Sequence, residues 1–231
     1  MLAVNDLNFS YGTIRTLRGI SMHMAKGRMT CVMGRNGVGK TTLIRNIMGF
    51  LQPDSGQIHV NETDITQLAP HVRVQRGLAL VPQGRQIFPK LTVEENLKVG
   101  LQARSDGLRR VPEEIYELFP VLKDMGRRMG GDLSGGQQQQ LAIGRALAGD
   151  PKLLLLDEPT EGIQPNIIQQ IGHVLRKLVD ERQMTVVLVE QYVNFVREFG
   201  QKFYIMDRGR VVADGETDNL TSELVHKHLS V

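Results

Sequence analysis

The chain of 231 residues is long enough to bury one large core, and its 41% hydrophobic and 23% charged residues are ordinary for a globular protein. The formal net charge of +3 comes without a block of Lys and Arg, which argues against a nucleic-acid-binding tail. The single cysteine, Cys31, excludes an internal disulfide, and the sequence has no run of about 18 apolar residues that could span a bilayer.

The N-terminal part of the chain, roughly the first 60 residues, has a β-rich pattern. Leu7, Phe9 and Tyr11 alternate with other residues, which predicts one face of a strand. The chain reaches Asp6 without a basic start and an apolar stretch, so we expect no signal peptide. Any membrane role would then come through a partner.

A glycine-rich loop lies between residues 30–33, which predict a strand, and residues 40–50, which predict a helix. It fits the phosphate-binding pattern G-x-x-x-x-G-K-[ST], whose glycines let backbone N–H groups close around phosphate oxygens. Lys40 offers a charge to the β- and γ-phosphates, and Thr41 offers a hydroxyl to Mg²⁺. A chance glycine turn is the alternative, which the flanking strand and helix disfavour. We therefore expect ATP to contact Gly34, Asn36, Gly37, Gly39, Lys40, Thr41 and Thr42.

The middle of the chain combines a short predicted strand with a longer, mainly helical stretch. Residues 78–81 predict a second short strand that ends at Pro82 and Gln83. The stretch 91–129 has no strong strand signal and much helical pattern. We interpret it as a helical insertion that rises from a core formed by residues 1–90 and 130–231.

Residues 133–137, Leu-Ser-Gly-Gly-Gln, predict the start of another helix. Ser134 is a good N-cap, and residues 137–148 are rich in helix formers. Gly135 and Gly136 would allow a phosphate to approach the backbone closely. A capped helix after a glycine turn is the plainer interpretation, but it does not explain the combination with the phosphate-binding loop.

Four leucines at 153–156 predict a strand that is buried on both faces of a parallel sheet. Asp157 and Glu158 follow, at the sheet edge where ligands bind in α/β folds. Asp157 is a candidate Mg²⁺ partner, directly or through water, and Glu158 is a candidate general base for the attacking water. Two acids that merely end a strand are the alternative, and the phosphate-binding loop upstream favours catalysis.

The C-terminal part predicts another buried strand at 185–189 and a hairpin formed by 203–206 and 210–213. Short strands therefore alternate with helices along the chain, which indicates the α/β class. The six histidines show no metal-binding spacing, so we assign no metal to them.

The order of the phosphate-binding loop, the 133–137 segment and the acidic pair resembles that of the ATP-binding-cassette (ABC) ATPases over nearly the whole chain. The resemblance implies a P-loop NTPase cassette with a RecA-like α/β core, an N-terminal antiparallel β subdomain and a helical insertion subdomain. It also implies that ATP and Mg²⁺ bind between two cassettes closed head-to-tail. The residues that would contact the ATP of the second ABC ATPase subunit are Ser134, Gly135, Gly136 and Gln137.

The resemblance assigns further roles around the nucleotide. Gln83 matches the glutamine that touches Mg²⁺ or water and links the ATP site to the helical insertion, so Thr41, Gln83 and Asp157 form the expected Mg²⁺ set. Tyr11 matches the aromatic residue that stacks on adenine, and the alternative is a strand aromatic that packs on the core.

Gln191 stands where most of these ATPases have a histidine that contacts the γ-phosphate. An amide donates a hydrogen bond but cannot become cationic near neutral pH. We therefore expect Glu158 to be the main catalyst and Gln191 to sense the γ-phosphate.

Two segments resemble particular importers. The Glu-Gln pair at 190–191 resembles branched-chain amino-acid importer ATPases of the LivF type, and residues 161–165 with the phosphate-binding loop resemble the UrtE-type subunits of urea importers. The resemblance implies an ATPase subunit at the cytoplasmic face of a bacterial inner membrane. As a homo- or heterodimer, it would drive permease subunits for urea and would indirectly serve a substrate-binding protein. The alternatives are an importer of branched-chain or other amino acids, a soluble cassette protein without transport, and a non-enzymatic nucleotide switch.

Overall fold

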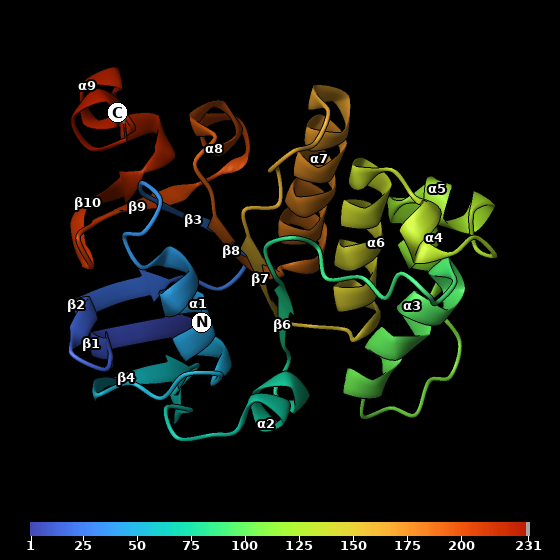
Figure 1. Ribbon diagram of the computed structural model, residues 1–231, viewed down its shortest axis with the longest axis horizontal. Coiled ribbons are helices and arrows are strands. Elements are labelled where there is room, and N and C mark those ends of the chain that lie inside the picture. Colours follow the sequence, from blue (N-terminus) through green and yellow to red (C-terminus); the bar gives the residue numbers. More distant parts are fainter. Residues whose placement is uncertain (230–231) are drawn as a thin grey trace.

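Residues 1–229 are described by a computed structural model that contains two β-sheets and the helices around them (Figure 1). The smaller sheet is antiparallel and has the strand order β2-β1-β4-β5. Its strands are β1 (Leu2–Tyr11), β2 (Ile14–Met24), β4 (Ser55–Val60) and β5 (Thr63–Asp64). The β-rich N-terminal part predicted from sequence is confirmed. Leu7 and Phe9 are buried, whereas Tyr11 at the end of β1 is 44% exposed and packs against the Phe9 ring on the same face of the strand.

The larger sheet has the order β10-β9-β3-β8-β7-β6. Its strands pair in parallel, except for the antiparallel hairpin of β9 and β10. Their bounds are β3 (Met29–Met33), β6 (Leu78–Val81), β7 (Leu153–Asp157), β8 (Thr185–Val189), β9 (Lys202–Asp207) and β10 (Arg210–Glu216). Every residue of β3, β7 and β8 is buried, as expected for strands covered on both faces. The strands and the hairpin predicted from sequence are thus confirmed.

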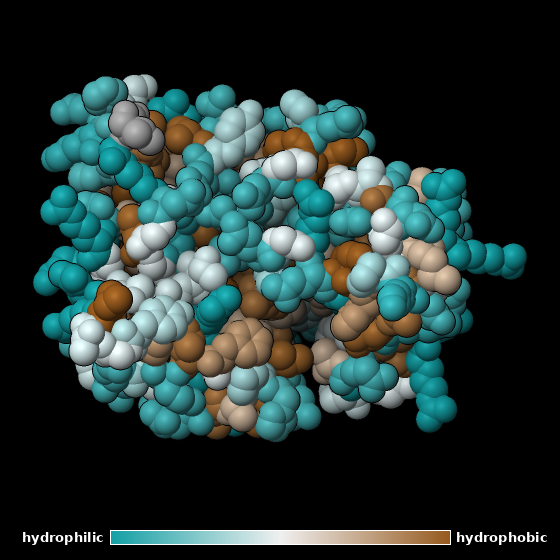
Figure 2. All heavy atoms as spheres, viewed as in Figure 1, coloured by the Kyte–Doolittle hydropathy of each residue, from teal (hydrophilic) through white to brown (hydrophobic). Residues whose placement is uncertain are grey.

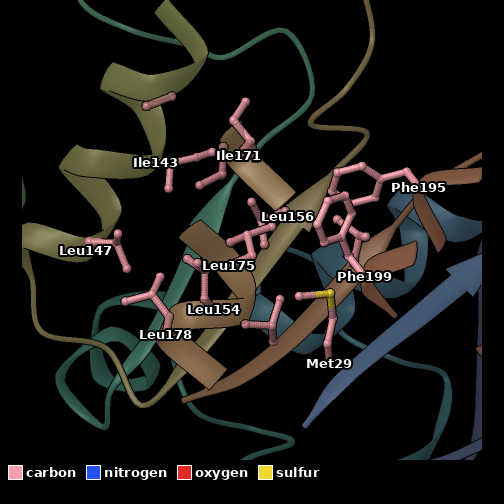
Figure 3. Close-up of a cluster of buried hydrophobic side chains, with 14 of the residues drawn as sticks. Met29, Ile143, Leu147, Leu154, Leu156, Ile171, Leu175, Leu178, Phe195 and Phe199 are labelled. Atoms are coloured by element: carbon pink, nitrogen blue, oxygen red, sulfur yellow. The ribbon is translucent and has the colours of Figure 1, made fainter. Parts of the chain in front are cut away.

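Helices cover both faces of the larger sheet. They are α1 (Lys40–Met48), α2 (Pro70–Gln75), α3 (Val93–Gly100), α4 (Glu113–Leu118), α5 (Pro120–Asp124), α6 (Gly135–Ala148), α7 (Pro165–Arg182), α8 (Val193–Phe199) and α9 (Ser222–His228). One core lies between α1 and the two sheets. The other joins α6, α7 and α8 to the opposite face of the larger sheet, where Leu154 and Leu156 meet Ile171 and Leu175 (Figure 3). Cys31, in β3, is fully buried in this second core.

The helix after the glycine-rich loop is shorter than the predicted 40–50. It ends at Met48 because Gly49 adopts a left-handed conformation, with φ 79°. The fully buried Arg73 of α2 donates from Nη1 to the carbonyls of Asn46 and Ile47, at 2.7 and 2.8 Å. A cation thus meets the negative end of α1, which is a favourable arrangement.

The stretch predicted as a helical insertion contains α3, α4 and α5. At its base, Val93 N–H donates to the Arg128 carbonyl at 2.9 Å and Gly130 N–H donates to the Leu91 carbonyl at 2.8 Å. The chain therefore enters and leaves the stretch side by side. Its buried residues belong to the same core as α6 and the larger sheet, and the division into subdomains at 91 and 129 stays a prediction. Among residues 1–229, no helix is both long and apolar enough to cross a membrane.

Candidate functional site

The candidate site lies where β7, β8 and β3 end side by side. In the parallel register, Asp157 pairs with Val189, and Val189 pairs with Val32 of β3. The residues that follow these three strands are therefore brought to one edge of the sheet. This register joins the glycine-rich loop, the acidic pair and the 190–192 segment, which are far apart in the sequence.

The glycine-rich loop between β3 and α1 curls around the amine of Lys40. Lys40 is 4% exposed, and its Nζ donates to the carbonyls of Gly34 and Arg35, at 2.8 and 3.0 Å. A Cβ on Gly34 would lie 2.5 Å from the Met206 carbonyl oxygen, so only glycine fits there. The N-cap of α1, Gly39, has φ 108°, and no acid stands in the first turn of this helix. Its positive end thus remains available to an anion.

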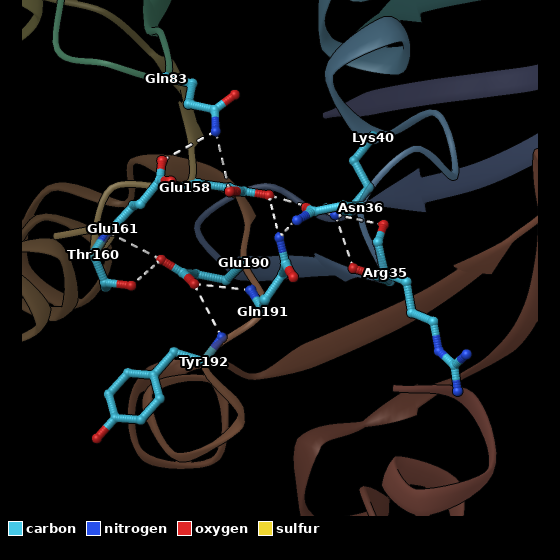
Figure 4. A network of polar contacts seen from close by, with 11 residues as sticks. Arg35, Asn36, Lys40, Gln83, Glu158, Thr160, Glu161, Glu190, Gln191 and Tyr192 are labelled. Atoms are coloured by element: carbon cyan, nitrogen blue, oxygen red, sulfur yellow. Dashed lines mark hydrogen bonds and ion pairs between the residues drawn. The ribbon is translucent and has the colours of Figure 1, made fainter. Parts of the chain in front are cut away.

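Glu158 lies at the centre of the site (Figure 4). It has a left-handed backbone, with φ 49°, and its N–H donates to the Val189 carbonyl at 2.9 Å. Lys40 Nζ lies 3.4 Å from Glu158 Oε1, and Gln83 Nε2 donates to Oε2 at 3.3 Å. The carboxylate is thus fixed from several sides beside the glycine-rich loop.

Gln191 bridges the loop and the acid. Its Nε2 donates to Asn36 Oδ1 at 2.6 Å and to Glu158 Oε1 at 2.7 Å (Figure 4). Both amide hydrogens are therefore used. The structure brings Asn36, Glu158 and Gln191 together as the sequence suggested, and their roles in turnover stay predictions.

Glu190, for which sequence reasoning found no role, is 2% exposed and accepts four hydrogen bonds. The donors are the Thr160 N–H and hydroxyl, at 3.1 and 2.5 Å, and the N–H groups of Gln191 and Tyr192, at 2.8 and 3.1 Å. It joins the loop after β7 to the loop after β8. An acid directly after the apolar strand 185–189 was the available signal, as it was for Asp157 and Glu158.

Asp157 is 3% exposed, and its Oδ1 has no hydrogen-bond partner within residues 1–229. Burial, reinforced by the neighbouring Glu158 charge, raises the pKa of Asp157, while the Thr41 hydroxyl and the Lys40 charge oppose the rise. Asp157, Thr41 and Gln83 line one cavity of about 1010 Å³. A buried oxygen without a partner beside a hydroxyl suits a hard divalent cation such as Mg²⁺.

The fit of Gln83 to that cation is poorer than expected. Its Nε2 donates to Glu158 and, at 3.0 Å, to Glu161 Oε2, so the amide must turn before its oxygen can face a metal. Within the part of the chain described, no three His, Cys, Asp or Glu side chains cluster as a metal site. A cation here would therefore depend on Asp157, the Thr41 hydroxyl, water and bound phosphate.

The 133–137 segment opens α6, as predicted, through a capping box. Ser134 Oγ accepts from the Gln137 N–H at 3.4 Å, and Gln137 Oε1 accepts from the Ser134 N–H at 2.9 Å. Ser134, Gly135, Gly136 and Gln137 line a second cavity of about 820 Å³, distinct from the one at Asp157. The chain thus carries this helix start away from its own glycine-rich loop.

Two other predicted residues lie outside the hydrogen-bond network. Tyr11 ends β1, is 44% exposed, and meets the edge of Phe9 with ring centroids 4.8 Å apart. Its exposure leaves a face free for stacking. Thr42 is 8% exposed in the first turn of α1.

Comparisons with known proteins agree with this geometry. A family described as ABC transporter matches residues 17–161. The chain is 40% identical over 213 residues to the high-affinity branched-chain amino acid transport ATP-binding protein BraG of Pseudomonas aeruginosa, covering 92% of this chain and 91% of the relative. It is 37% identical over 223 residues to a probable branched-chain amino acid transport ATP-binding protein, LivF, of Archaeoglobus fulgidus, covering 95% and 94%.

Solved structures with the same fold include a nucleotide-free ATP-binding cassette from an ABC transporter. The match has a TM-score of 0.83 and 29% identity, and covers 100% of this chain and 95% of that one. A dimeric bacterial ABC transporter cassette matches with a TM-score of 0.86 and 25% identity over 94% and 99%. The α/β cassette expected from sequence is thus confirmed.

Proposed function

The chain belongs to the ABC transporter family of ATPases, and from that premise we propose that it powers import of a branched-chain amino acid by hydrolysing ATP. The observation that carries the ATPase assignment is the cluster of Lys40, Glu158, Gln191 and Asn36 at the glycine-rich loop. The cargo rests on the two relatives named for branched-chain amino acid transport, each aligned over more than 90% of both chains. The urea cargo expected from sequence has no such support.

The side chains divide the work of phosphoryl transfer. Lys40 exchanges the carbonyls of Gly34 and Arg35 for the β- and γ-phosphates of ATP. Glu158, then released from Lys40, accepts a proton from the attacking water and so orients it towards the γ-phosphate. Gln191 keeps one amide hydrogen on Glu158 and directs the other at a γ-phosphate oxygen. Asp157 and the Thr41 hydroxyl would hold Mg²⁺, which would stabilise the negative charge that develops on the phosphates.

A second cassette completes the site. The start of α6 is an anion-facing helix end carried away from the chain's own phosphate loop, so its ligand is the ATP of a partner. The match to a dimeric cassette supports this arrangement. The partner is either a second copy or a related ATPase subunit.

Permease subunits dock in the groove beside the helical segment. Phe50, Phe88 and Val99 are exposed apolar residues that line the cavity shared with Gln83 and Asp157. Figure 2 shows brown, hydrophobic patches interrupting the mostly hydrophilic surface on the face that carries α2 and α3. Such a contact would hold the chain at the cytoplasmic face of a bacterial inner membrane. The permease subunits would then contact the chain next to Gln83.

Urea remains the second candidate cargo because residues 161–165 and the phosphate-binding loop resemble those of urea-importer subunits. Reconstitution with the permeases and a substrate-binding protein separates the two. With the wild-type complex, we expect leucine, isoleucine or valine to stimulate ATP turnover and to accumulate in vesicles. With the Glu158→Gln complex, we expect neither stimulation nor accumulation. Stimulation by urea alone would favour the second candidate, and no stimulation by any of these solutes would contradict both.

A further inference from the structure

Glu190 is a buried acid that the mechanism above does not use. It directly follows β8, is 2% exposed, and accepts hydrogen bonds only from main-chain N–H groups and one hydroxyl. Burying a carboxyl group is costly unless several donors compensate for the water that it loses. Four donors at 2.5 to 3.1 Å supply that compensation here.

The donors come from two different loops, as Figure 4 shows. Oε1 faces Thr160, two residues after Glu158, and Oε2 faces the N–H groups of Gln191 and Tyr192. One side chain therefore fixes the distance between the loop that carries the general base and the loop that carries the γ-phosphate sensor. The Gln191 N–H bond sets the backbone from which the amide reaches Glu158 at 2.7 Å.

We propose that Glu190 is a positioning residue for ATP hydrolysis, which holds the amide of Gln191 in register with the carboxylate of Glu158. This inference rests on the roles proposed above for those two residues. Glu190 is 2% exposed, and both of its carboxylate oxygens are occupied by the four donors of the two loops. Its contribution is geometric, and small misplacements of reacting groups are costly in catalysis.

Glu190→Gln tests this geometry with little change in the shape of the side chain. An amide offers one oxygen and one NH₂ group, and the NH₂ group would face the N–H donors of one of the two loops. One loop is then released. Thr160→Val is a milder variant, since it removes only the hydroxyl bond at 2.5 Å, and Thr160→Ser is its matched control because it keeps that hydroxyl.

The assay measures ATP turnover, equilibrium ATP binding and thermal stability in the assembled transporter complex. We expect Glu190→Gln to lower kcat by about 10- to 100-fold, with a Kd for ATP within about twofold of the wild type, because positioning acts on the reacting groups. In a Gln191→Ala background, Glu190→Gln should lower kcat by less than about twofold, because the amide that Glu190 positions is already absent. Glu198→Gln, an exposed acid on α8 that accepts from Gln169, should leave turnover unchanged.

Three results would overturn the inference. They are unchanged kcat in Glu190→Gln, a kcat loss that multiplies fully with that of Gln191→Ala, or a loss of stability without loss of turnover. If Glu190→Gln does not fold, Thr160→Val decides: it should lower kcat severalfold while Thr160→Ser does not, and equal turnover in both would refute the inference. Full turnover by Glu158→Gln would instead contradict the proposed function itself, whatever Glu190 does.

Discussion

Replacing Asp157 by asparagine should make the metal-free protein more stable. The carboxylate is 3% exposed, and one oxygen has no hydrogen-bond partner within residues 1–229. Asparagine keeps polar atoms at this position but removes the buried charge, whose burial is costly. Each unit by which burial raises the pKa of Asp157 costs about 1.4 kcal/mol at neutral pH. We expect Asp157→Asn to gain about 1–2 kcal/mol at pH 7, which corresponds to roughly 2–8 °C in Tm for a chain of this size.

The gain should depend on pH in a defined direction. The folded-state pKa of Asp157 lies above its ordinary value of 3.8, so the ionised form weakens the fold at every pH above the folded pKa. As the pH falls through the folded pKa towards 3.8, Asp157 of the wild type takes up a proton, and the destabilisation caused by its buried charge disappears. The difference in stability between variant and wild type should therefore shrink in that window. Asp124→Asn, an exposed acid at the end of α5, is the control and should show no gain.

Differential scanning fluorimetry in EDTA, at neutral and acidic pH, measures the effect. Addition of Mg²⁺ with ADP should then raise Tm in the wild type more than in Asp157→Asn. The neutral asparagine side chain binds a divalent cation more weakly than a carboxylate does. The reasoning is refuted if the variant is no more stable than the wild type at pH 7, or if its advantage grows in acid. Equal stabilisation of both proteins by Mg²⁺ would remove Asp157 from the metal site.

The other predictions concern the nucleotide and the core. Glu158→Gln should slow turnover by about 100-fold or more while ATP binding persists and the closed dimer accumulates in size-exclusion chromatography; unchanged turnover would contradict its role. Lys40→Ala should abolish binding of a fluorescent ATP analogue, and retained affinity would refute its place on the phosphates. Gln191→His should stay active and acquire a pH dependence near the histidine pKa of about 6.5, so loss of activity at all pH values would show that a neutral amide is required. Arg73→Met should lower the free energy of unfolding by about 1–3 kcal/mol in urea titrations, because it leaves the carbonyls at the end of α1 unpaired, and an unchanged free energy of unfolding would contradict this.

Local patterns were sufficient to predict most of the core. The apolar runs that became β3, β7 and β8 each lead into a polar segment, which is why the glycine-rich loop and the acidic pair were found. The N-cap at Ser134 was equally local, and the structure adds the reciprocal bond from Gln137. The exposure of Tyr11 was not predictable, because apolar alternation predicts a shared face for Leu7, Phe9 and Tyr11 but not where cover by the rest of the fold ends.

The contacts that make the site one unit needed tertiary structure. Gln191 and Asn36 are separated by 155 positions, and only the side-by-side order of β3, β8 and β7 explains their bond. Glu190 was missed for the same reason: two of its four donors belong to Thr160, which is thirty positions away. Sequence spacing identified the groups of the site but not which of them touch.

The buried cysteine has a practical consequence for measuring how two cassettes approach. Cys31 is fully buried in β3, and burial together with the Glu190 charge raises the pKa of its thiol, so it is both inaccessible and protonated at neutral pH. Maleimide dyes should therefore not react with the native protein. A cysteine introduced at an exposed position would be the sole attachment point for a fluorophore or spin label, and distances across the assembly could be followed during turnover without first removing the natural thiol.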